Sequence, residues 1–389
     1  MSAGASVTLR RATPQDVEPI LDLLTEYGRP RSYFEPFYLN DTSYRPEHSW
    51  VIEQQGRLLS HLRVYDRWIR IGRAKLRIAG IGNVITAQNA HGYGYAGQLM
   101  LAMLTELQRE EYAYSLLWTH TPNFYEHYGW VPIEQQAVRA SLPSSHLYSI
   151  KIVPFEYDDL PAVMRLYDIA NAERTGMIIR SREYWREQPT WLHEKRESFL
   201  VARDSDGGPL VGYGRSRVVH KNIELLELGL AAGRFDIGRA LLTAASRERN
   251  GQLEGRLPPS QRAIFLPDEF EIFSDFGLMG RAMNLTGLIS ALEAMWQDRI
   301  REAGVSKGSF QLSTRAGRII VQVSKGSIRT SMKSVDEMVP PLNEREFAHL
   351  LFQGVDEHTR TFIENRPDAS LLQVLFPKQD FAIWQADTF

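Results

Sequence analysis

One stretch of the sequence carries residue types and a spacing that suit phosphate binding. The stretch Asn83–Ala96 begins as a strand and continues through a glycine-bearing turn into a helix. Apolar residues spaced three and four apart indicate that helix: Ala96, Leu99, Met100, Met103, Leu104 and Leu107. A strand that turns through glycines into a helix N-terminus points unpaired backbone N–H groups at one spot, and the helix dipole reinforces them. We therefore predict a phosphate-binding site at this turn.

The spacing of the glycines narrows the kind of phosphate site. A Walker loop is excluded because no Gly-Lys-Ser/Thr follows, and no early strand carries the Gly-x-Gly-x-x-Gly pattern with a later acidic residue that Rossmann folds require. The segment His91–Ala96 instead resembles the Arg/Gln-x-x-Gly-x-Gly/Ala loop of the GNAT superfamily of acetyl-CoA-dependent N-acetyltransferases. Histidine stands where arginine or glutamine is usual. A second segment, Phe124–Trp130, resembles the Phe-Tyr-x-x-x-Gly-Phe segment of the same superfamily.

Acyl transfer from a thioester to an amine has three requirements. The amine must be neutral when it attacks, the carbonyl oxygen must meet a hydrogen-bond donor, and the departing thiolate needs a proton. A strand edge with a free N–H near Val84–Thr86 suits the second requirement. A tyrosine with a pKa of ~10 suits the third, because a thiol has a pKa near ~8.5.

Composition bounds the possible functions. With 389 residues, 43% hydrophobic and 24% charged, the chain has the composition of a soluble globular protein and the length of two or three domains. Its net charge of −2 gives no basic field for nucleic acid, and the absence of cysteine excludes disulfides, thiolate metal sites and a cysteine nucleophile. Residues 1–6 lack the apolar region of a signal peptide, and no long apolar run is present. We expect a cytoplasmic protein that binds no nucleic acid, membrane or metal.

The elements that must position the loop follow in the order typical of a GNAT domain. We predict a strand at 7–10, a helix that begins at Thr13-Pro14 and ends at Gly28, and loops or short helices over 29–48. Strands are predicted at 50–53, 58–64, 66–71, 76–86 and 114–119, and a short helix at 122–130.

The chain then repeats this pattern. Residues 150–166 match residues 7–23, with Asp159 in the place of Asp16. A hairpin over 199–213, turned by Asp206-Gly207-Gly208, a strand at 224–228 and a helix at 237–247 complete a second copy, whose turn Ala231–Asp236 is shortened. We interpret this copy as a duplicated domain with a decayed cofactor loop; two unrelated α/β segments are the alternative.

A different pattern begins near residue 282. A long amphipathic helix, closed by Gly304, is indicated by Leu285, Leu288, Ile289, Leu292, Met295, Trp296 and Ile300. Three antiparallel strands follow at 310–313, 319–323 and 328–332, then helices at 344–352 and 369–376. A long helix on a small sheet resembles a sterol-carrier module.

Together these parts resemble the enhanced intracellular survival (Eis-like) family of GNAT N-acetyltransferases over essentially the whole chain. The resemblance implies an α/β (α+β) fold with tandem GNAT-like domains, the second degenerate, and a sterol-carrier-like C-terminal domain. The implied boundaries are 1–145, 146–281 and 282–389, with a tail that returns to the first active site. The family implies acetyl-CoA as co-substrate, no metal, and a homohexamer built as a trimer of dimers. Acceptors would be small-molecule amines, aminoglycoside- or polyamine-like, or a lysine.

The resemblance also implies roles for particular residues. The backbone of Val84, Ile85 and Thr86 would meet the pantetheine arm; Tyr125 would be the general acid, and Phe389 would supply a carboxylate that orients the amine. The pyrophosphate would be wrapped by His91, Gly92, Tyr93, Gly94, Tyr95 and Ala96. The loop departs from the family in having no arginine, so charge neutralisation is lost although backbone donors remain.

Alternatives stay open at several positions. Tyr125 is alternatively a core aromatic residue, with Tyr128 as the acid, and His120 is alternatively a structural histidine or an aid to amine deprotonation. For the whole chain the alternative is a non-catalytic binder of an acyl-CoA or of an apolar ligand. The apolar residues of the tail, Phe381, Ile383, Trp384 and Phe389, predict that it is docked.

Overall fold

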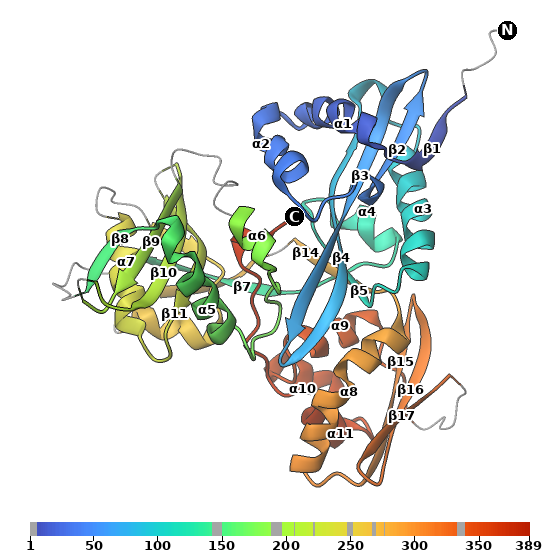
Figure 1. Cartoon of the computed structure of the whole chain (residues 1–389). Helices are drawn as coiled ribbons and strands as arrows, with labels where there is room; N and C mark the ends of the chain where they lie inside the picture. Colours follow the sequence, from blue (N-terminus) through green and yellow to red (C-terminus); the bar gives the residue numbers. More distant parts are fainter. Residues whose placement is uncertain are drawn as a thin grey trace.

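The computed structural model describes residues 6–141, 150–187, 197–205, 207–220, 222–246, 252–266, 270–275, 277–332 and 339–389. Three bodies share this chain, each built on one β-sheet (Figure 1). Two of the sheets have seven strands with both parallel and antiparallel neighbours, and the third has three antiparallel strands. The arrangement confirms the predicted α+β fold, with two large domains and a smaller C-terminal domain.

The first sheet has the strand order β1-β2-β3-β4-β5-β14-β6. Its strands are β1 (Thr8–Arg11), β2 (Ser49–Gln54), β3 (Arg57–Ile71), β4 (Ala74–Thr86), β5 (Tyr114–Trp118), β14 (Leu278–Ala282) and β6 (Val131–Pro132). The helices α1 (Val17–Leu24), α2 (Arg31–Glu35), α3 (Tyr95–Arg109) and α4 (Pro122–His127) accompany it. The two strands predicted on either side of Tyr65 form one strand, β3, because Tyr65 is itself buried and paired with Gly80.

The second sheet has the order β13-β7-β12-β11-β10-β9-β8. Its strands are β7 (Gln135–Ser141), β8 (Lys151–Pro154), β9 (Glu197–Arg203), β10 (Leu210–Val219), β11 (Asn222–Leu230), β12 (Gln252–Gly255) and β13 (Phe270–Asp275). The helices are α5 (Leu160–Ala170), α6 (Arg182–Glu187) and α7 (Phe235–Ser246). The turn predicted at 206–208 joins β9 to β10; its first residue, Asp206, lies outside the described residues.

Both domains begin with the same local structure. The carboxylates of Asp16 and Asp159 each accept a hydrogen bond from the backbone N–H three residues earlier, at 2.7 and 3.1 Å. An arginine of a neighbouring strand pairs with each carboxylate, Arg10 with Asp16 and Arg203 with Asp159. The hydrogen bonds from Arg10 lower the pKa of Asp16 to about 2. The repetition supports the internal duplication.

Each of the two large sheets includes one strand from a segment that the expected domain boundaries do not assign to that domain. Strand β7 lies before the expected boundary at 145, yet it pairs with β12 and β13 in the second sheet. Strand β14 spans the expected boundary between 281 and 282, yet it pairs with β5 and β6 in the first sheet. All five residues of β14 are buried, so the first sheet is complete only when the chain returns from the second domain.

The C-terminal body places helices against the three-stranded sheet. It comprises α8 (Leu285–Glu302), β15 (Lys307–Thr314), β16 (Gly317–Ser324), β17 (Ser327–Ser331), α9 (Glu344–Phe352), α10 (Glu357–Ile363) and α11 (Ala369–Leu375). The Asn284 side chain caps α8 by accepting the Gly287 N–H at 3.0 Å. Helix α10 was not predicted, because its short sequence carries no clear periodicity.

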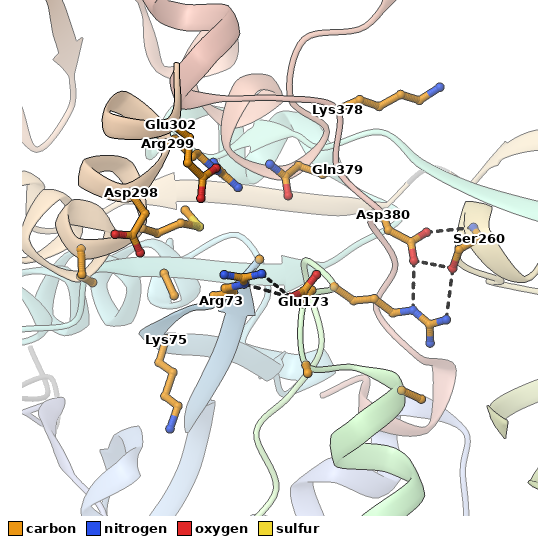
Figure 2. Close-up of a pocket in the computed structure, with 18 of the residues that line it drawn as sticks. Arg73, Lys75, Glu173, Ser260, Asp298, Arg299, Glu302, Lys378, Gln379 and Asp380 are labelled. Carbon is orange, nitrogen blue, oxygen red and sulfur yellow. Dashed lines mark hydrogen bonds and ion pairs between the residues drawn. The ribbon is translucent and has the colours of Figure 1, made fainter. Parts of the chain in front are cut away.

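A cavity of about 1130 Å³ lies where the three bodies meet. Figure 2 shows charged side chains around it, with Arg73 of the turn between β3 and β4 paired to Glu173 at 2.7 Å. Arg174 pairs with Asp380 at 3.0 Å, and Asp380 also accepts a hydrogen bond from Ser260. None of the predicted site residues lines this cavity, and its ion pairs join the bodies to one another.

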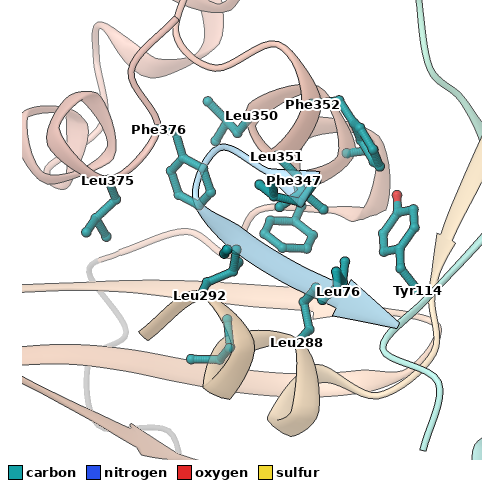
Figure 3. Packing of buried hydrophobic residues seen from close by; sticks show 14 of the residues in the cluster. Leu76, Tyr114, Leu288, Leu292, Phe347, Leu350, Leu351, Phe352, Leu375 and Phe376 are labelled. Atoms are coloured by element: carbon teal, nitrogen blue, oxygen red, sulfur yellow. The ribbon is translucent and has the colours of Figure 1, made fainter. Parts of the chain in front are cut away.

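The C-terminal body shares its core with the first sheet. In Figure 3, Leu288 and Leu292 of α8 gather with Phe347, Phe376 and Leu76, the last from β4. An apolar ligand in the C-terminal body would have to meet the apolar side of this helix, and its residues lie in this cluster: Leu288, Leu292, Met295 and Trp296. Their packing favours the core interpretation, and it fixes the C-terminal body to the first domain.

The segment 377–389, here called the tail, runs from the C-terminal body to the space between the first two domains (Figure 1). Its backbone bonds to Thr175, whose N–H donates to the carbonyl of Asp380 at 3.2 Å. The N–H of Ile383 donates to the side chain of Gln135 at 2.9 Å, and Trp384 is 1% exposed. Backbone bonds and apolar burial therefore hold most of the tail in place.

Candidate active site

Strand β4 contains a bulge at Asn83. Between the pairs made by Gly82 and Ile85, two residues of β4, Asn83 and Val84, oppose a single residue of β3. Asn83 has a φ of 52°, in the left-handed region that few residues other than glycine and asparagine adopt. A bulge of this kind re-aims the backbone groups that follow it and often lies beside an active site.

Buried side chains hold the bulge in place. The Nδ1–H of His61 donates to the carbonyl of Asn83 at 2.9 Å, and the Asn83 amide donates to the hydroxyls of Tyr38 and Tyr65 at 2.9 and 3.1 Å. Burial lowers the pKa of His61 to about 3, so the ring is neutral and its Nε2 accepts from the Ser49 hydroxyl at 3.0 Å. The strained conformation is thus over-determined by its surroundings.

Beyond the bulge, β4 continues without β5. The parallel pairing of the two strands extends from Ile78–Tyr114 to Ile81–Leu117, after which β5 ends at Trp118 while β4 runs to Thr86. The hydroxyl of Tyr27 donates to the carbonyl of Val84 at 2.6 Å on this segment. Ile85 and Thr86 still pair with β3, but on the side of β5 the edge of β4 at Val84–Thr86 lies beyond the last pair of the two strands, Ile81 and Leu117.

The predicted phosphate loop joins β4 to α3. Gly92 and Gly94 have φ values of 85° and 72°, which glycine adopts without strain, and Gly94 is the N-cap of α3. The ring of His91 donates from Nε2 to the carbonyl of Thr86 at 2.9 Å, so His91 braces the loop. The first turn of α3 holds no acidic residue, and a Cβ added at either glycine would meet no atom within 4 Å. The loop is open on the side where its glycines lie.

Two tyrosines beside the loop stack on one another. The rings of Tyr93 and Tyr95 have centroids 5.6 Å apart and planes 14° from parallel, and Tyr93 is 67% exposed. They present an aromatic surface beside the loop, which contains no arginine.

Gly94→Glu is expected to abolish acetyl-CoA binding to this loop. The variant forces a φ of 72° on an L-residue and places a carboxylate where the pyrophosphate is expected. Calorimetry measures the loss. Gly94→Asn is the matched control, because asparagine tolerates the conformation and adds no charge; it should keep most of the affinity, and equal losses in both variants would contradict the electrostatic reason.

Tyr125 lies on α4 and is 8% exposed. Its ring packs against Phe124 and Trp130, with centroids 5.0 and 6.3 Å away, in the same core cluster as Ile85. Burial raises the pKa of Tyr125 to about 12. The hydroxyl of the alternative, Tyr128, lies against the first turn of α3, where a Cβ on Gly97 would approach it to 2.5 Å.

Phe389 lies against the face of β4 that is turned away from Tyr125 and α3. Its ring stacks on Tyr65 at 5.6 Å and meets Trp118 edge-on at 4.8 Å, and a Cβ on Gly80 would come within 2.5 Å of it. Its main-chain carboxyl carbon would be 3.0 Å from a Cβ on Gly82. The two glycines, spaced by two along the strand, leave room for this residue.

Tyr125 and Phe389 therefore approach β4 from opposite faces. Ala79 and Ile81 point to the core under α3 that contains Tyr125, whereas Gly80 and Gly82 face Phe389, because side chains alternate along a strand. The open segment of β4 after Ile81 lies between them.

Comparison with known proteins identifies the first domain. Residues 8–133 match the family model described as an acetyltransferase (GNAT) domain. The first domain is a GNAT acetyltransferase domain. No match was found among curated proteins.

Solved structures show that the whole architecture recurs around GNAT domains. A GCN5-related N-acetyltransferase from Kribbella flavida is 16% identical, with 100% of both chains covered and a TM-score of 0.72. A probable N-acyltransferase from Enterococcus faecalis V583, itself of unknown function, is 15% identical over 99% of this chain and 100% of its own, with a TM-score of 0.75. Eis1 from Mycobacterium abscessus is 13% identical over the same shares, with a TM-score of 0.66. At these identities the likeness concerns the fold, which confirms the predicted Eis-like architecture.

Two cavities flank Phe389 on the side of the GNAT domain away from α3. One, of about 960 Å³, is lined by Trp118, His120, Arg256 and Asp275 among others. The other, of about 280 Å³, is lined by Tyr33, Phe34 and Phe37, together with Tyr65 and Asn83. Both cavities reach Arg217, Gln385, Thr388 and Phe389.

The larger cavity carries acids that already have partners. Glu224 pairs with Arg217, Glu254 with Arg139 at 2.6 Å and Asp275 with Arg256 at 2.5 Å. The wall of this cavity therefore presents paired charges, while His120 and Trp118 contribute an imidazole and an indole to the cavity that Phe389 also lines.

Sequence reasoning missed three parts of this site. The glycines that accommodate Phe389 could have been found from their spacing of two within a strand, Gly80 and Gly82. The bulge at Asn83 and the hydrogen bond from His61 that holds it leave no local sequence signal.

Among the described residues, no group of three or more His, Asp or Glu residues is placed to hold a metal ion, and no helix has the length and apolarity needed to cross a membrane.

Proposed function

We propose that this chain transfers the acetyl group of acetyl-CoA to a primary amine of a small molecule, aminoglycoside- or polyamine-like, or of a lysine. One observation carries the proposal: the open segment of β4 has a GNAT loop on one side and the Phe389 carboxyl group beside two cavities on the other. A thioester laid along this segment would expose its carbonyl to an amine from the cavities.

Acetyl-CoA would bind through the backbone of β4 and the N-terminus of α3. The backbone of Val84, Ile85 and Thr86 would bond the pantetheine amides, and the loop His91–Ala96 would cradle the pyrophosphate. The chemistry that acetyl-CoA supplies is an acetyl group activated as a thioester.

The second domain is not expected to bind a donor. Helix α7 carries its own acid, Asp236, in the first turn, and Arg234 pairs with it at 2.9 Å. Since this helix N-terminus is already supplied with a carboxylate, we expect one acetyl-CoA per chain, which calorimetric stoichiometry measures.

The proposed transfer forms one covalent bond and breaks another. The neutral amine attacks the thioester carbonyl, a C–N bond forms and the C–S bond breaks. The oxygen is stabilised by backbone N–H groups after the bulge at Asn83, and the amine proton leaves toward the Phe389 carboxylate or through water. The sulfur leaves as a thiolate that accepts a hydrogen bond from the Tyr125 hydroxyl, and it takes up one proton, which balances the proton released by the amine. Because a free α-carboxylate has a pKa near ~3.5, the Phe389 group orients the amine and receives its charge rather than acting as a strong base.

The missing arginines predict a weak dependence of acetyl-CoA affinity on salt. Surface ion pairs are screened at a Debye length of about 8 Å, whereas backbone N–H groups and stacking respond little to salt. We expect Kd to change by less than about threefold between ~50 and ~300 mM salt. Calorimetry at both concentrations is the measurement, and a steep increase would show that cations outside the loop neutralise the pyrophosphate.

CoA release tests the proposed function directly. The chain has no cysteine, so a thiol reagent reports free CoA without background from the protein. Incubation with acetyl-CoA and a panel of polyamines, aminoglycosides and lysine peptides should release CoA with at least one amine. Tight acetyl-CoA binding without release from any amine would favour the non-catalytic binder, and co-purified lipid found by mass spectrometry would favour an apolar ligand.

The proposal includes assembly as a homohexamer, a trimer of dimers, by analogy with the resembled family. Light scattering on the purified chain measures the mass, and a monomer at micromolar concentration would refute this part alone.

A further inference from the structure

The tail is anchored two residues before Phe389 by a buried ion pair. Arg180 donates to both carboxylate oxygens of Asp387, at 3.0 and 2.8 Å, and the Tyr184 hydroxyl donates to the same carboxylate at 2.9 Å. The side chains of Arg180 and Asp387 are both 0% exposed. A fork of two parallel bonds fixes direction as well as distance, so Asp387 has little freedom.

The second domain supplies a rigid base for this anchor. Arg180 also makes two bonds to Glu227 of β11, at 2.9 and 2.6 Å, and its guanidinium lies over the rings of Tyr167 and Trp185 at 4.2 and 4.4 Å. With Arg215 at 3.7 Å from Glu227, two arginines balance two carboxylates in the interior. The charges of the anchor are therefore compensated without solvent.

A second attachment holds the other end of the same short segment. From Asp387 to Phe389 the backbone spans at most about 7 Å, and the Phe389 ring is held between Tyr65 and Trp118 of the first sheet. Fixing both ends confines the carboxyl group to the neighbourhood of Gly82.

We propose that Arg180, with Glu227 behind it, is a positioning residue that sets the location of the Phe389 carboxylate in the active site of the GNAT domain. The inference rests on the proposed function. It gives the second domain, whose own turn is unsuited to a donor, a part in the reaction: it holds the end of the C-terminal body in the active site of the first domain.

The test uses Arg180→Lys in the full chain. Lysine keeps one positive charge but cannot make the fork to Asp387 and Glu227 together. We expect kcat to fall at least about tenfold while the Kd for acetyl-CoA changes less than about twofold. Arg174→Lys is the matched control: it alters the other Arg–Asp pair of the tail, with Asp380, at 3.0 Å, and should leave kcat within about twofold.

A double variant separates positioning from general stability. In a chain without Phe389, Arg180→Lys should cause no further loss of kcat, because the group on which it acts is gone. A loss of equal size in both backgrounds would show that Arg180 acts through the fold, and an unchanged kcat in the single variant would overturn the proposal. If Arg180→Lys does not fold, Tyr184→Phe removes one bond to Asp387 and should give a smaller loss of the same non-additive kind.

Carboxypeptidase digestion provides a readout that needs no catalysis. Phe389 should be released several-fold faster from Arg180→Lys than from the wild type or Arg174→Lys. A wild-type chain that transfers no acetyl group to any amine refutes the proposed function. Equal release of Phe389 from the wild type and Arg180→Lys refutes the anchor, whichever way the activity assay turns out.

Discussion

Removal of Phe389 alone is expected to lower acetyl transfer by about 10²- to 10⁴-fold while the chain stays folded and binds acetyl-CoA. The carboxyl group and the ring both leave the face of β4 at Gly80 and Gly82, so the incoming amine loses its orienting group. A loss of activity after deletion of all of Asp387–Phe389 would be harder to interpret, because that deletion also removes a buried carboxylate that pairs with Arg180. Steady-state CoA release measures the loss, and calorimetry checks donor binding.

Gly80→Ala offers a test with the complete tail. A Cβ at this position would approach the Phe389 ring to 2.5 Å, so the ring must shift and carry the carboxyl group with it. We expect a smaller loss of activity than deletion causes, with unchanged acetyl-CoA affinity. Wild-type rates after deletion of Phe389 would separate the tail from the chemistry.

The parts of the fold that the sequence predicted are those with a local pattern. Apolar residues at three- and four-residue spacing predict helix α3, and glycines that adopt positive φ indicate the loop before it. The repeat was visible because the same strand, turn and Asp-containing helix start occur twice. Helix α9 begins and ends where its cap and period predict, from Glu344 to Phe352.

The parts that the sequence did not predict depend on contacts between distant residues. Nothing in Leu278–Ala282 distinguishes a strand of the second sheet from one that returns to the first, because pairing partners are chosen by tertiary packing. The bulge at Asn83 depends on His61, Tyr38 and Tyr65 from other elements. Likewise Arg180 and Asp387 are far apart in sequence, so no spacing rule joins them.

The candidate site divides in the same way. Its donor half could be predicted, because a loop and a helix N-terminus are continuous in sequence. Its acceptor half is assembled from β3, β5, the second domain and the tail, and residue types alone do not reveal such an assembly. The shared core of α8 and β4 is another such contact, and it ties the C-terminal body to the domain whose site the tail enters.

Tyr125→Phe is expected to lower turnover by about 10²-fold with little change in acetyl-CoA affinity. The substitution removes one hydroxyl and almost no volume, so the packing on Phe124 and Trp130 survives. Because the pKa of Tyr125 is about 12, well above that of a thiol, we expect its hydroxyl to stabilise the leaving thiolate mainly as a hydrogen-bond donor. Single-turnover CoA release is the measurement.

The raised pKa also fixes the sign of the pH dependence. Tyr125 is protonated at every pH below about 12, so the donor is fully present across the assay range and is lost only near that value. Wild-type turnover should therefore rise with pH as the acceptor amine is deprotonated and show no decline below about pH 10 from this residue. Tyr128→Phe is the matched control: Tyr128 lies three residues after Tyr125, at the end of α4, and its hydroxyl lies against the first turn of α3, so this variant should keep near-wild-type turnover. If instead Tyr128→Phe carries the loss and Tyr125→Phe does not, the general acid is Tyr128, and Tyr125 is a core residue whose high pKa records only its burial.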